Sequence, residues 1–279
     1  MEQADGDVPS SSQTTAGGEG DVPPRMQHLF VMRHGDRLDD ADHNWIFKAP
    51  RPWDPPLTDM GKHRARRVGR SLRHQGWNIT RVVCSPFLRC IQTASEVITG
   101  LCSLDPFDDD STEVAIDPSK VKVSIEYGLC EVMNSYAIRV PQMPPTGPTT
   151  LDLEDLEVLL PAGTVDATVP KIMAKLPDWR ETLDASYKRY VDTFQAIADM
   201  FPGENILCVT HGEGVSVSVT QHHNVTVYQV RYLNVVFKMA MFVYCLKGQR
   251  HQSYTEISHG VIKHSLALLG LNAVGQVNV

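Results

Sequence analysis

Hydrophobic and polar positions divide the chain into short apolar runs and longer amphipathic stretches. Four runs with few charges predict strands, because their Val, Ile, Leu and Cys content is typical of strands buried on both faces. These runs lie at 27–32, 80–84, 121–126 and 205–209. Two later runs, 225–230 and 235–245, predict strands toward an antiparallel edge.

Helical patterns fill the intervals between these runs, at 59–75, 86–101, 180–200 and 212–220. In the third, apolar residues recur at steps of three and four from Leu183 to Phe201, and Pro202-Gly203 ends the pattern. Alternating strands and helices predict the α/β class, as a three-layer α/β/α sandwich around a mostly parallel central sheet.

Two segments depart from this alternation. Residues 1–25 are polar, acidic and rich in Gly, Ser and Pro, so we expect a disordered tail before a single domain at 26–279. Within that domain, residues 134–178 hold seven prolines and only a short helical pattern. Such a segment is typical of an insertion that covers a functional site.

Composition and charge argue against some classes of binding partner. A formal net charge of −7 argues against a nucleic-acid binder, and no apolar run is long enough to cross a bilayer. The N-terminus lacks the pattern of a signal peptide. Six scattered cysteines without metal-binding spacing favour reduced thiols in an intracellular, cytoplasmic protein.

The first predicted strand ends in Arg33-His34-Gly35-Asp36. Side chains at the carboxyl end of a parallel strand lie where open α/β sheets bind ligands. Arginine binds phosphate through a planar set of donors, and an unprotonated histidine can attack phosphorus.

Three more motifs follow other predicted strands. Ser85-Pro86 begins the second helical pattern, so we expect Ser85 to cap a helix that opens at Pro86, with Arg89 in its first turn. A segment with two glutamates, 126–131, follows the third strand, and Thr210-His211-Gly212 follows the fourth. These groups are therefore expected to meet at one edge of the sheet.

In combination the motifs resemble those of the histidine phosphatase superfamily, which has the phosphoglycerate-mutase-like fold. The resemblance covers roughly residues 26 to 260. It follows the family order of Arg-His-Gly, Leu57-Thr58-x-x-Gly61, Ser-Pro-x-x-Arg-x-x-x-Thr-Ala, a glutamate and a late His-Gly. The resemblance implies a phosphomonoester phosphatase that acts through phosphohistidine and needs no metal or other cofactor.

The resemblance also implies individual roles. His34 would be the nucleophile, and Arg33, Arg89 and His211 would surround the phosphoryl oxygens. Glu131 would protonate the leaving oxygen and then activate water. Glu126 is the competing carboxylate, but it falls inside the predicted strand.

The residues that follow Arg-His-Gly distinguish the branches of the superfamily. Mutases and fructose-bisphosphatases typically read Arg-His-Gly-Glu-Ser-x-x-Asn, whereas this chain has Asp36, Arg37 and Asp40 at the differing positions. That difference counts against a mutase. The start is similar to the phosphatase domains of the suppressor-of-T-cell-receptor-signalling proteins, and the chain also resembles single-domain phosphoglycerate mutase family proteins. By the first likeness, Arg37 would be a fourth phosphate-binding cation, unless it pairs with Asp36 or Asp39.

Two alternatives remain open at this stage: a phosphoglycerate-type mutase, and a phospho-ligand binding module with weak catalysis. The substrate would be a phosphorylated small molecule or a phosphoprotein, and neither nucleic acid nor membrane is expected as a partner. Trp45, Phe47 and Trp53 would either stack on a substrate or pack together as a lid. The oligomeric state, with a homodimer among the options, is left open.

Overall fold

A computed structural model describes residues 27–105, 114–140, 143, 147, 151–220, 225–229 and 240–246. The predicted tail at 1–25 lies outside the described residues, and so do parts of the predicted insertion at 134–178 and residues 235–239 of the last predicted strand.

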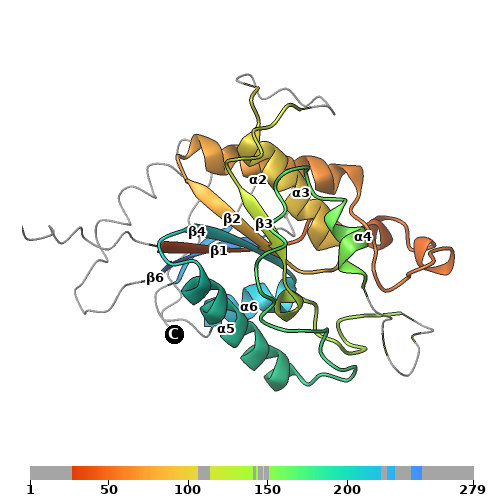
Figure 1. The fold of residues 1–279 in the computed structure, drawn as a ribbon. Coiled ribbons are helices and arrows are strands. Elements are labelled where there is room, and N and C mark those ends of the chain that lie inside the picture. The colour runs from red at the N-terminus through yellow and green to blue at the C-terminus, as the bar shows by residue number, and fades with distance from the viewer. Residues whose placement is uncertain are drawn as a thin grey trace, which may run out of the picture.

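One six-stranded sheet forms the centre of the molecule, in the order β3-β2-β4-β1-β6-β5 (Figure 1). Its strands are β1 Gln27–Arg33, β2 Ile79–Cys84, β3 Lys122–Ile125, β4 Asn205–Thr210, β5 Val225–Gln229 and β6 Ala240–Leu246. The pairs β1–β4, β4–β2 and β2–β3 are parallel, whereas β6 is antiparallel to both β1 and β5. The predicted mostly parallel sheet with an antiparallel edge is confirmed.

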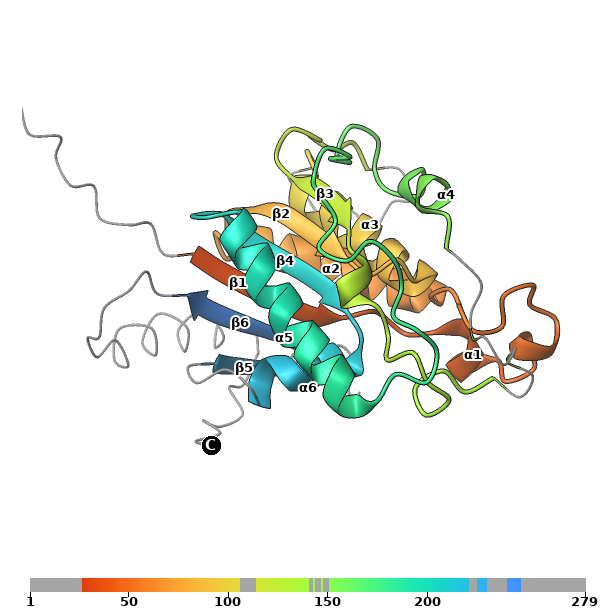
Figure 2. The ribbon, with the colours of Figure 1, turned by 60° about the horizontal axis from the view of Figure 1, so that its bottom comes forward.

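Helices lie on both faces of this sheet (Figures 1 and 2). The longer ones are α2 Asp59–His74, α3 Leu88–Cys102, α5 Leu183–Met200 and α6 Gly212–Thr220, and the shorter ones are α1 Leu38–Ala41, η1 Trp45–Phe47, η2 Tyr127–Leu129 and α4 Leu153–Glu157. Helices α2 and α3 cover one face, and α5 and α6 cover the other. This arrangement is the predicted three-layer sandwich.

Successive side chains along the strands pack into two separate hydrophobic cores. In β1, Phe30 and Met32 pack in one cluster with residues of α2 and α3, whereas Leu29 and Val31 pack in the other with residues of α5 and α6. Side chains alternate across a strand, so a strand covered on both faces must be apolar at every position. That requirement explains the continuous apolar run that ends in Arg33.

Helices α2 and α3 approach each other closely through two glycines. A Cβ atom added at Gly69 would lie 2.1 Å from the carbonyl oxygen of Val97, and one at Gly100 would lie 2.2 Å from that of Arg66. Backbone therefore packs on backbone where these helices meet, and this contact places α3 against the sheet.

Two sequence predictions about helices are wrong in detail. Helix α3 begins at Leu88, and Ser85 does not cap it; the amide of Leu88 instead donates to Oδ1 of Asp54, at 2.8 Å. Leu183 was assigned to the apolar face of α5, but it lies in the first turn and is half exposed. Arg89 does lie in the first turn of α3, as predicted.

The described part of the 134–178 segment packs along the β3 edge of the sheet. Val165 forms a parallel bridge with Val123, and the backbone amides of Ile172 and Met173 donate to the carboxylate of Glu126. Glu126 also accepts from the amide of Gly128, so its carboxylate is used within this packing. A role of the segment as a cap over the site stays a prediction.

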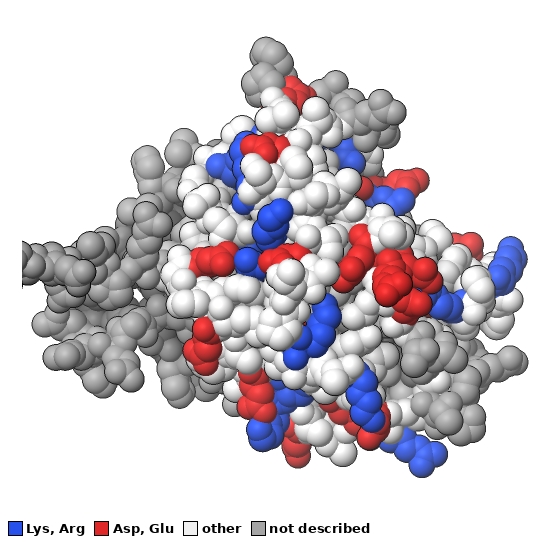
Figure 3. Space-filling model, in the orientation of Figure 1, with Lys and Arg blue, Asp and Glu red and all other residues white. Residues whose placement is uncertain are grey.

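Charged side chains of both signs are interspersed on the face of the molecule in Figure 3. Among the helices that the structure describes, none has the length and hydrophobicity needed to span a membrane.

Candidate active site

Four buried polar side chains come together beyond the carboxyl ends of the parallel strands. His34 follows β1, His211 follows β4, Arg89 lies in the first turn of α3 and Glu131 follows η2. Arg33 is the last residue of β1. The structure therefore brings together residues that are far apart in the sequence, as the order of strands predicted.

Backbone contacts fix the position and the tautomer of His34. Its amide donates to the carbonyl of Thr210, at 3.0 Å, and its Nδ1 lies 2.8 Å from the carbonyl oxygen of Gly35. Because a carbonyl oxygen only accepts, Nδ1 carries the proton and Nε2 keeps its lone pair. The amide of Gly35 in turn donates to Oγ1 of Thr93, at 3.0 Å.

The electrostatic environment keeps the His34 ring neutral. Burial lowers the pKa of His34 well below its ordinary value, and the positive charge of Arg89, together with His211 and Arg33, lowers it further. An unprotonated ring is the form that can act as a nucleophile.

The loop after His34 packs tightly on the start of α2. A Cβ atom at Gly61 would lie 2.7 Å from the carbonyl oxygen of Asp36, and the amide of Thr58 donates to the same oxygen, at 2.9 Å. The Thr58 hydroxyl caps α2 by accepting from Gly61. The Leu57-Thr58-x-x-Gly61 motif thus holds the nucleophile loop in place.

Arg89, Glu131 and His211 form a buried contact network. Nη2 of Arg89 lies 3.1 Å from Nδ1 of His211 and 3.4 Å from Oε2 of Glu131, and that Oε2 lies 3.3 Å from Nδ1 of His211. The ring centroids of His34 and His211 are 5.4 Å apart. The network therefore adjoins the face of the candidate nucleophile.

These contacts shift the acidity of both titratable partners. Burial raises the pKa of Glu131, but His211 and Arg89 outweigh it and hold that pKa at about 2. Burial also lowers the pKa of His211, to about 4, against the opposing effect of Glu131. In the free protein at neutral pH, Glu131 is thus a carboxylate and His211 is a neutral ring.

Several buried arginine donors in this cluster have no hydrogen-bond partner among the residues that the structure describes. They are Nε of Arg33 and both Nε and Nη1 of Arg89. Buried donors are normally paired, and each unpaired one has a desolvation cost. Unpaired guanidinium donors beside a neutral histidine have the chemistry expected of an oxyanion site.

Arg37 lies in a different environment from the four buried residues. Its Nε donates to Oδ1 of Asp39, at 2.9 Å, so the structure contains the pairing that was weighed against a phosphate contact. Burial lowers the pKa of Arg37, but the Asp39 carboxylate outweighs burial and raises it. A phosphate-binding role for Arg37 stays a prediction.

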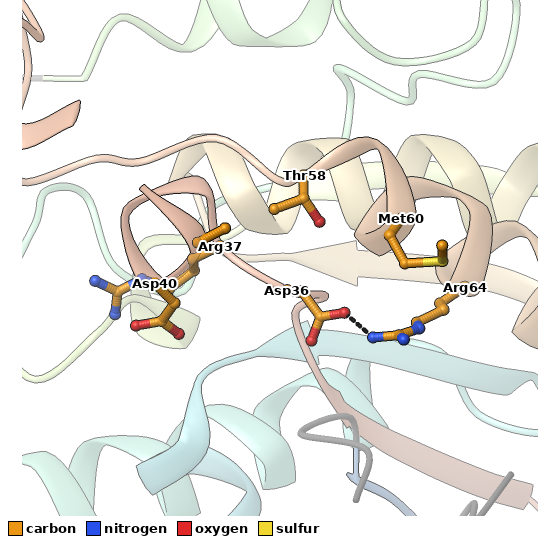
Figure 4. Close-up of a pocket in the computed structure, with 7 residues that line it drawn as sticks. Asp36, Arg37, Asp40, Thr58, Met60 and Arg64 are labelled. Carbon is orange, nitrogen blue, oxygen red and sulfur yellow. Dashed lines mark hydrogen bonds and ion pairs between the residues drawn. The ribbon is translucent and has the colours of Figure 1, made fainter. Parts of the chain in front are cut away.

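A shallow pocket of about 390 Å³ adjoins the loop after His34 (Figure 4). In it, Asp36 pairs with Arg64 at one end, whereas Arg37 and Asp40 lie at the other. The lining residues are Asp36, Arg37, Asp40, Ala41, Thr58, Met60 and Arg64.

The three aromatic residues considered for substrate stacking do not behave as one group. Trp53 is buried and packs edge-on against Phe87, with ring centroids 5.9 Å apart. Phe47 is 75% exposed, and Trp45 is partly buried.

Sequence reasoning missed two side chains that contact the cluster. Oγ of Ser85 lies 2.8 Å from Nε2 of His211, although Ser85 was expected to cap a helix. Oδ1 of Asp54 lies 3.8 Å from Nη1 of Arg89. An Asp before two prolines has the pattern of a turn, so nothing local pointed to this contact. Among the described residues, no cluster of three or more His, Cys, Asp or Glu is arranged to hold a metal ion.

Comparisons with known proteins agree with this geometry. The family model described as "Histidine phosphatase superfamily (branch 1)" matches residues 29–110. The ecdysteroid-phosphate phosphatase of Drosophila melanogaster is 27% identical over 218 residues, which are 67% of this chain and 26% of that protein. Ubiquitin-associated and SH3 domain-containing protein B of Homo sapiens is 27% identical over 232 residues, or 71% and 32% of the two chains.

A solved structure supports the same fold. The ecdysone phosphate phosphatase of Bombyx mori, in complex with tungstate, superimposes with a TM-score of 0.52 at 23% identity, over 81% of this chain and 96% of that one. The chain spans only about a quarter to a third of the length of the curated relatives it matches. The chain is therefore similar to the histidine phosphatase superfamily over residues 29–110 and shares the fold of the ecdysone phosphate phosphatase.

Proposed function

We propose that the chain is a metal-independent phosphatase that hydrolyses phosphomonoesters through a phosphohistidine at His34. The observation that carries the proposal is the geometry of that ring. Nδ1 is bound to the Gly35 carbonyl, the pKa is far below its ordinary value, and unpaired Arg89 donors lie in the same cluster. A neutral nucleophile beside buried cationic donors is suited to attack on a phosphate group.

In the first step, Nε2 of His34 forms a bond to phosphorus while the bond from phosphorus to the ester oxygen breaks. Arg33, Arg89 and His211 stabilise the charge that spreads over the remaining phosphoryl oxygens. The leaving oxygen takes a proton and departs as an alcohol.

Glu131 is the proposed carrier of that proton. With its pKa held at about 2, it needs a proton that arrives with the substrate, and the monoanion of a phosphomonoester has one, since its second pKa is about 6. Phosphoryl oxygens that take over the contacts of Arg89 and His211 also remove the two groups that hold the Glu131 pKa down.

In the second step, water attacks phosphorus and gives its proton to the Glu131 carboxylate, while the bond from phosphorus to Nε2 breaks. The departing inorganic phosphate takes this proton from Glu131, so the cycle returns the Glu131 carboxylate and neutral His34. The arginines supply positive charge and His211 supplies a hydrogen-bond donor in both steps, so the proposed cycle uses no metal ion or organic cofactor.

The substrate proposal extends to a phosphorylated small molecule or a phosphoprotein. Two relatives that carry the name ecdysteroid-phosphate phosphatase make a phosphorylated alcohol the first class to screen. Neither a nucleic acid nor a membrane is part of the proposal.

We further propose a reducing compartment such as the cytoplasm as the place of action. Five buried cysteines are free thiols: Cys84, Cys90, Cys102, Cys130 and Cys208. Burial raises the pKa of Cys84 and of Cys130 to about 12, so these thiols are unreactive and behave as core residues.

The test is hydrolysis of p-nitrophenyl phosphate in EDTA by wild type, His34→Ala and His63→Ala. His63 is exposed on α2 and serves as the matched control. Activity should survive chelation, remain in His63→Ala and fall by about 1,000-fold or more in His34→Ala.

Full activity of His34→Ala would rule out the phosphohistidine. Isomerisation of phosphoglycerates without release of inorganic phosphate would favour the mutase instead. Absence of turnover together with tight binding of a phosphorylated ligand would favour the binding module.

A further inference from the structure

Asp54 is a buried carboxylate that the proposed mechanism does not use. It lies between the loop after His34 and helix α2, and its side chain is fully buried. Oδ1 accepts from the amide of Leu88, whereas Oδ2 has no hydrogen-bond partner in the described part of the chain and lies 3.7 Å from Nη2 of Arg51. A buried carboxylate with one unpaired oxygen is costly, which points to a purpose other than packing.

Asp54 lies beside the guanidinium of Arg89. Oδ1 lies 3.8 Å from Nη1 of Arg89, whereas Glu131 contacts the other terminal nitrogen, Nη2. The guanidinium carbon also lies 4.6 Å from the centroid of the Phe87 ring. Arg89 is therefore held by an aromatic face and by one carboxylate near each terminal nitrogen.

The segment that carries Asp54 also connects α3 to the nucleophile loop. The amide of Leu57 donates to Oε1 of Gln92 on α3, at 2.7 Å, and the amide of Thr58 donates to the carbonyl of Asp36. Residues 54–58 thus bond to the helix of Arg89 on one side and to the loop of His34 on the other.

Capping of α3 alone would not explain this arrangement. An amide oxygen accepts from a backbone N–H as a carboxylate does, so a cap does not need a buried charge. Burial raises the pKa of Asp54 above its ordinary value, although Arg89, the Leu88 amide and Arg51 oppose that rise by favouring the carboxylate form. Arg51 and Arg89 both lie within 4 Å of the Asp54 carboxylate, and of these two cations Arg89 belongs to the active-site cluster.

We propose that Asp54 is a positioning residue for the phosphatase reaction: its negative charge fixes the guanidinium of Arg89 in the orientation that meets the phosphoryl oxygens. This inference rests on the proposed function, in which Arg89 stabilises the transition state. Asp54 itself touches no reacting atom.

The test separates the effect of the Asp54 charge from the effect of its hydrogen bond to the Leu88 amide at the start of α3. Asp54→Asn keeps an acceptor for Leu88 and removes the charge, whereas Asp54→Ala removes both. Asp152→Asn is the matched control, because Asp152 caps another helix, α4, through the amide of Glu154. For each variant we would measure the melting temperature, kcat and KM for p-nitrophenyl phosphate, and the affinity for orthovanadate by calorimetry.

Asp54→Asn should melt within about 2 °C of wild type, with kcat and vanadate affinity about tenfold lower and KM changed less than about threefold. Asp54→Ala should lose melting temperature as well, and Asp152→Asn should alter neither kcat nor vanadate affinity. In an Arg89→Lys background the cost of Asp54→Asn should shrink to less than about threefold, because the paired guanidinium is gone.

A folded Asp54→Asn protein with wild-type kcat and vanadate affinity would overturn the positioning role and leave the phosphatase intact. An equal loss in the Arg89→Lys background would also overturn it. If the wild type has no turnover, the proposed function fails, and vanadate binding, which needs no turnover, still decides the role of Asp54 by the same comparison.

Discussion

The groups around His211 allow its ring to form hydrogen bonds in either of two tautomers. Its Nδ1 faces Arg89, which only donates, and Glu131, whose carboxylate only accepts, and its Nε2 faces the hydroxyl of Ser85. A neutral imidazole carries a single ring proton, so changing the partner of Nδ1 moves that proton. The Ser85 hydroxyl can donate or accept, and so it can pair with Nε2 in either tautomer.

Removing this hydroxyl should therefore impair the site without unfolding the protein. We expect Ser85→Ala to lower kcat by about tenfold, since Nε2 of His211 loses the hydroxyl and is left with the weaker contact of Cys90 Sγ, at 3.6 Å. Ser186→Ala is the control, because Ser186 is also buried and its hydroxyl donates to the carbonyl of Leu183 in the same helix, α5. Steady-state kinetics with p-nitrophenyl phosphate would show equal kcat for both variants if Ser85 had no part in the reaction.

Site residues were predictable where a strand and a motif coincided. His34 and His211 each follow a buried strand directly, so their meeting follows from the parallel sheet. Ser85 was assigned the wrong contact because a Ser-Pro pair has the pattern of a helix start, while its actual partner lies 126 residues away. Contacts that depend on where a side chain points across the sheet leave no local signal in the sequence.

At the scale of elements, the close crossing of α2 and α3 controls where Arg89 lies. Strand and helix positions followed from hydrophobic periodicity, with shifts at the ends. The start of α3 at Leu88 did not, because the group that caps it comes from Asp54 in another segment. The crossing itself depends on Gly69 and Gly100, whose role is visible only once the two helices are placed together.

Gly69→Ala should strongly destabilise the protein, since the added methyl would lie 2.1 Å from the carbonyl oxygen of Val97 and backbone atoms would have to move. We expect a loss of about 3 kcal/mol or more in the free energy of unfolding, measured by denaturant titration. Gly203→Ala is the control that separates steric overlap from backbone strain. Gly203 has a φ of +77°, and no atom of the described residues lies within 4 Å of the added Cβ. That control should cost about 1 kcal/mol, and similar losses for both variants would show that the crossing tolerates the methyl.

At the scale of the whole molecule, the active site concentrates buried titratable groups at one edge of an apolar two-core sandwich. The cost of keeping His34 and His211 neutral is met by the stability of the entire fold, whereas the charged form of Glu131, with its lowered pKa, adds to that stability. Folding stability should therefore depend on pH in a way set by these three groups.

The sign follows from the shifted pKa values. Both histidines have lowered pKa values, mainly through burial, and that of His211 is about 4. Between pH 6.5 and the folded-state value, the unfolded chain binds more protons, so acidification through this range favours unfolding. The lowered pKa of Glu131, about 2, adds stability that is present above pH 4.5 and is lost as the pH falls toward 2.

We expect the melting temperature, followed by calorimetry, to fall by about 5 °C or more between pH 7 and pH 5, before ordinary carboxylates titrate. His34→Asn should flatten this fall, because it removes one buried histidine that must stay neutral, whereas His63→Ala should leave the fall unchanged, because His63 is exposed. A melting temperature that is constant from pH 7 to pH 5 would mean that His34 and His211 bind protons equally in the folded and unfolded chain. The neutral nucleophile on which the proposed mechanism depends would then have to be abandoned.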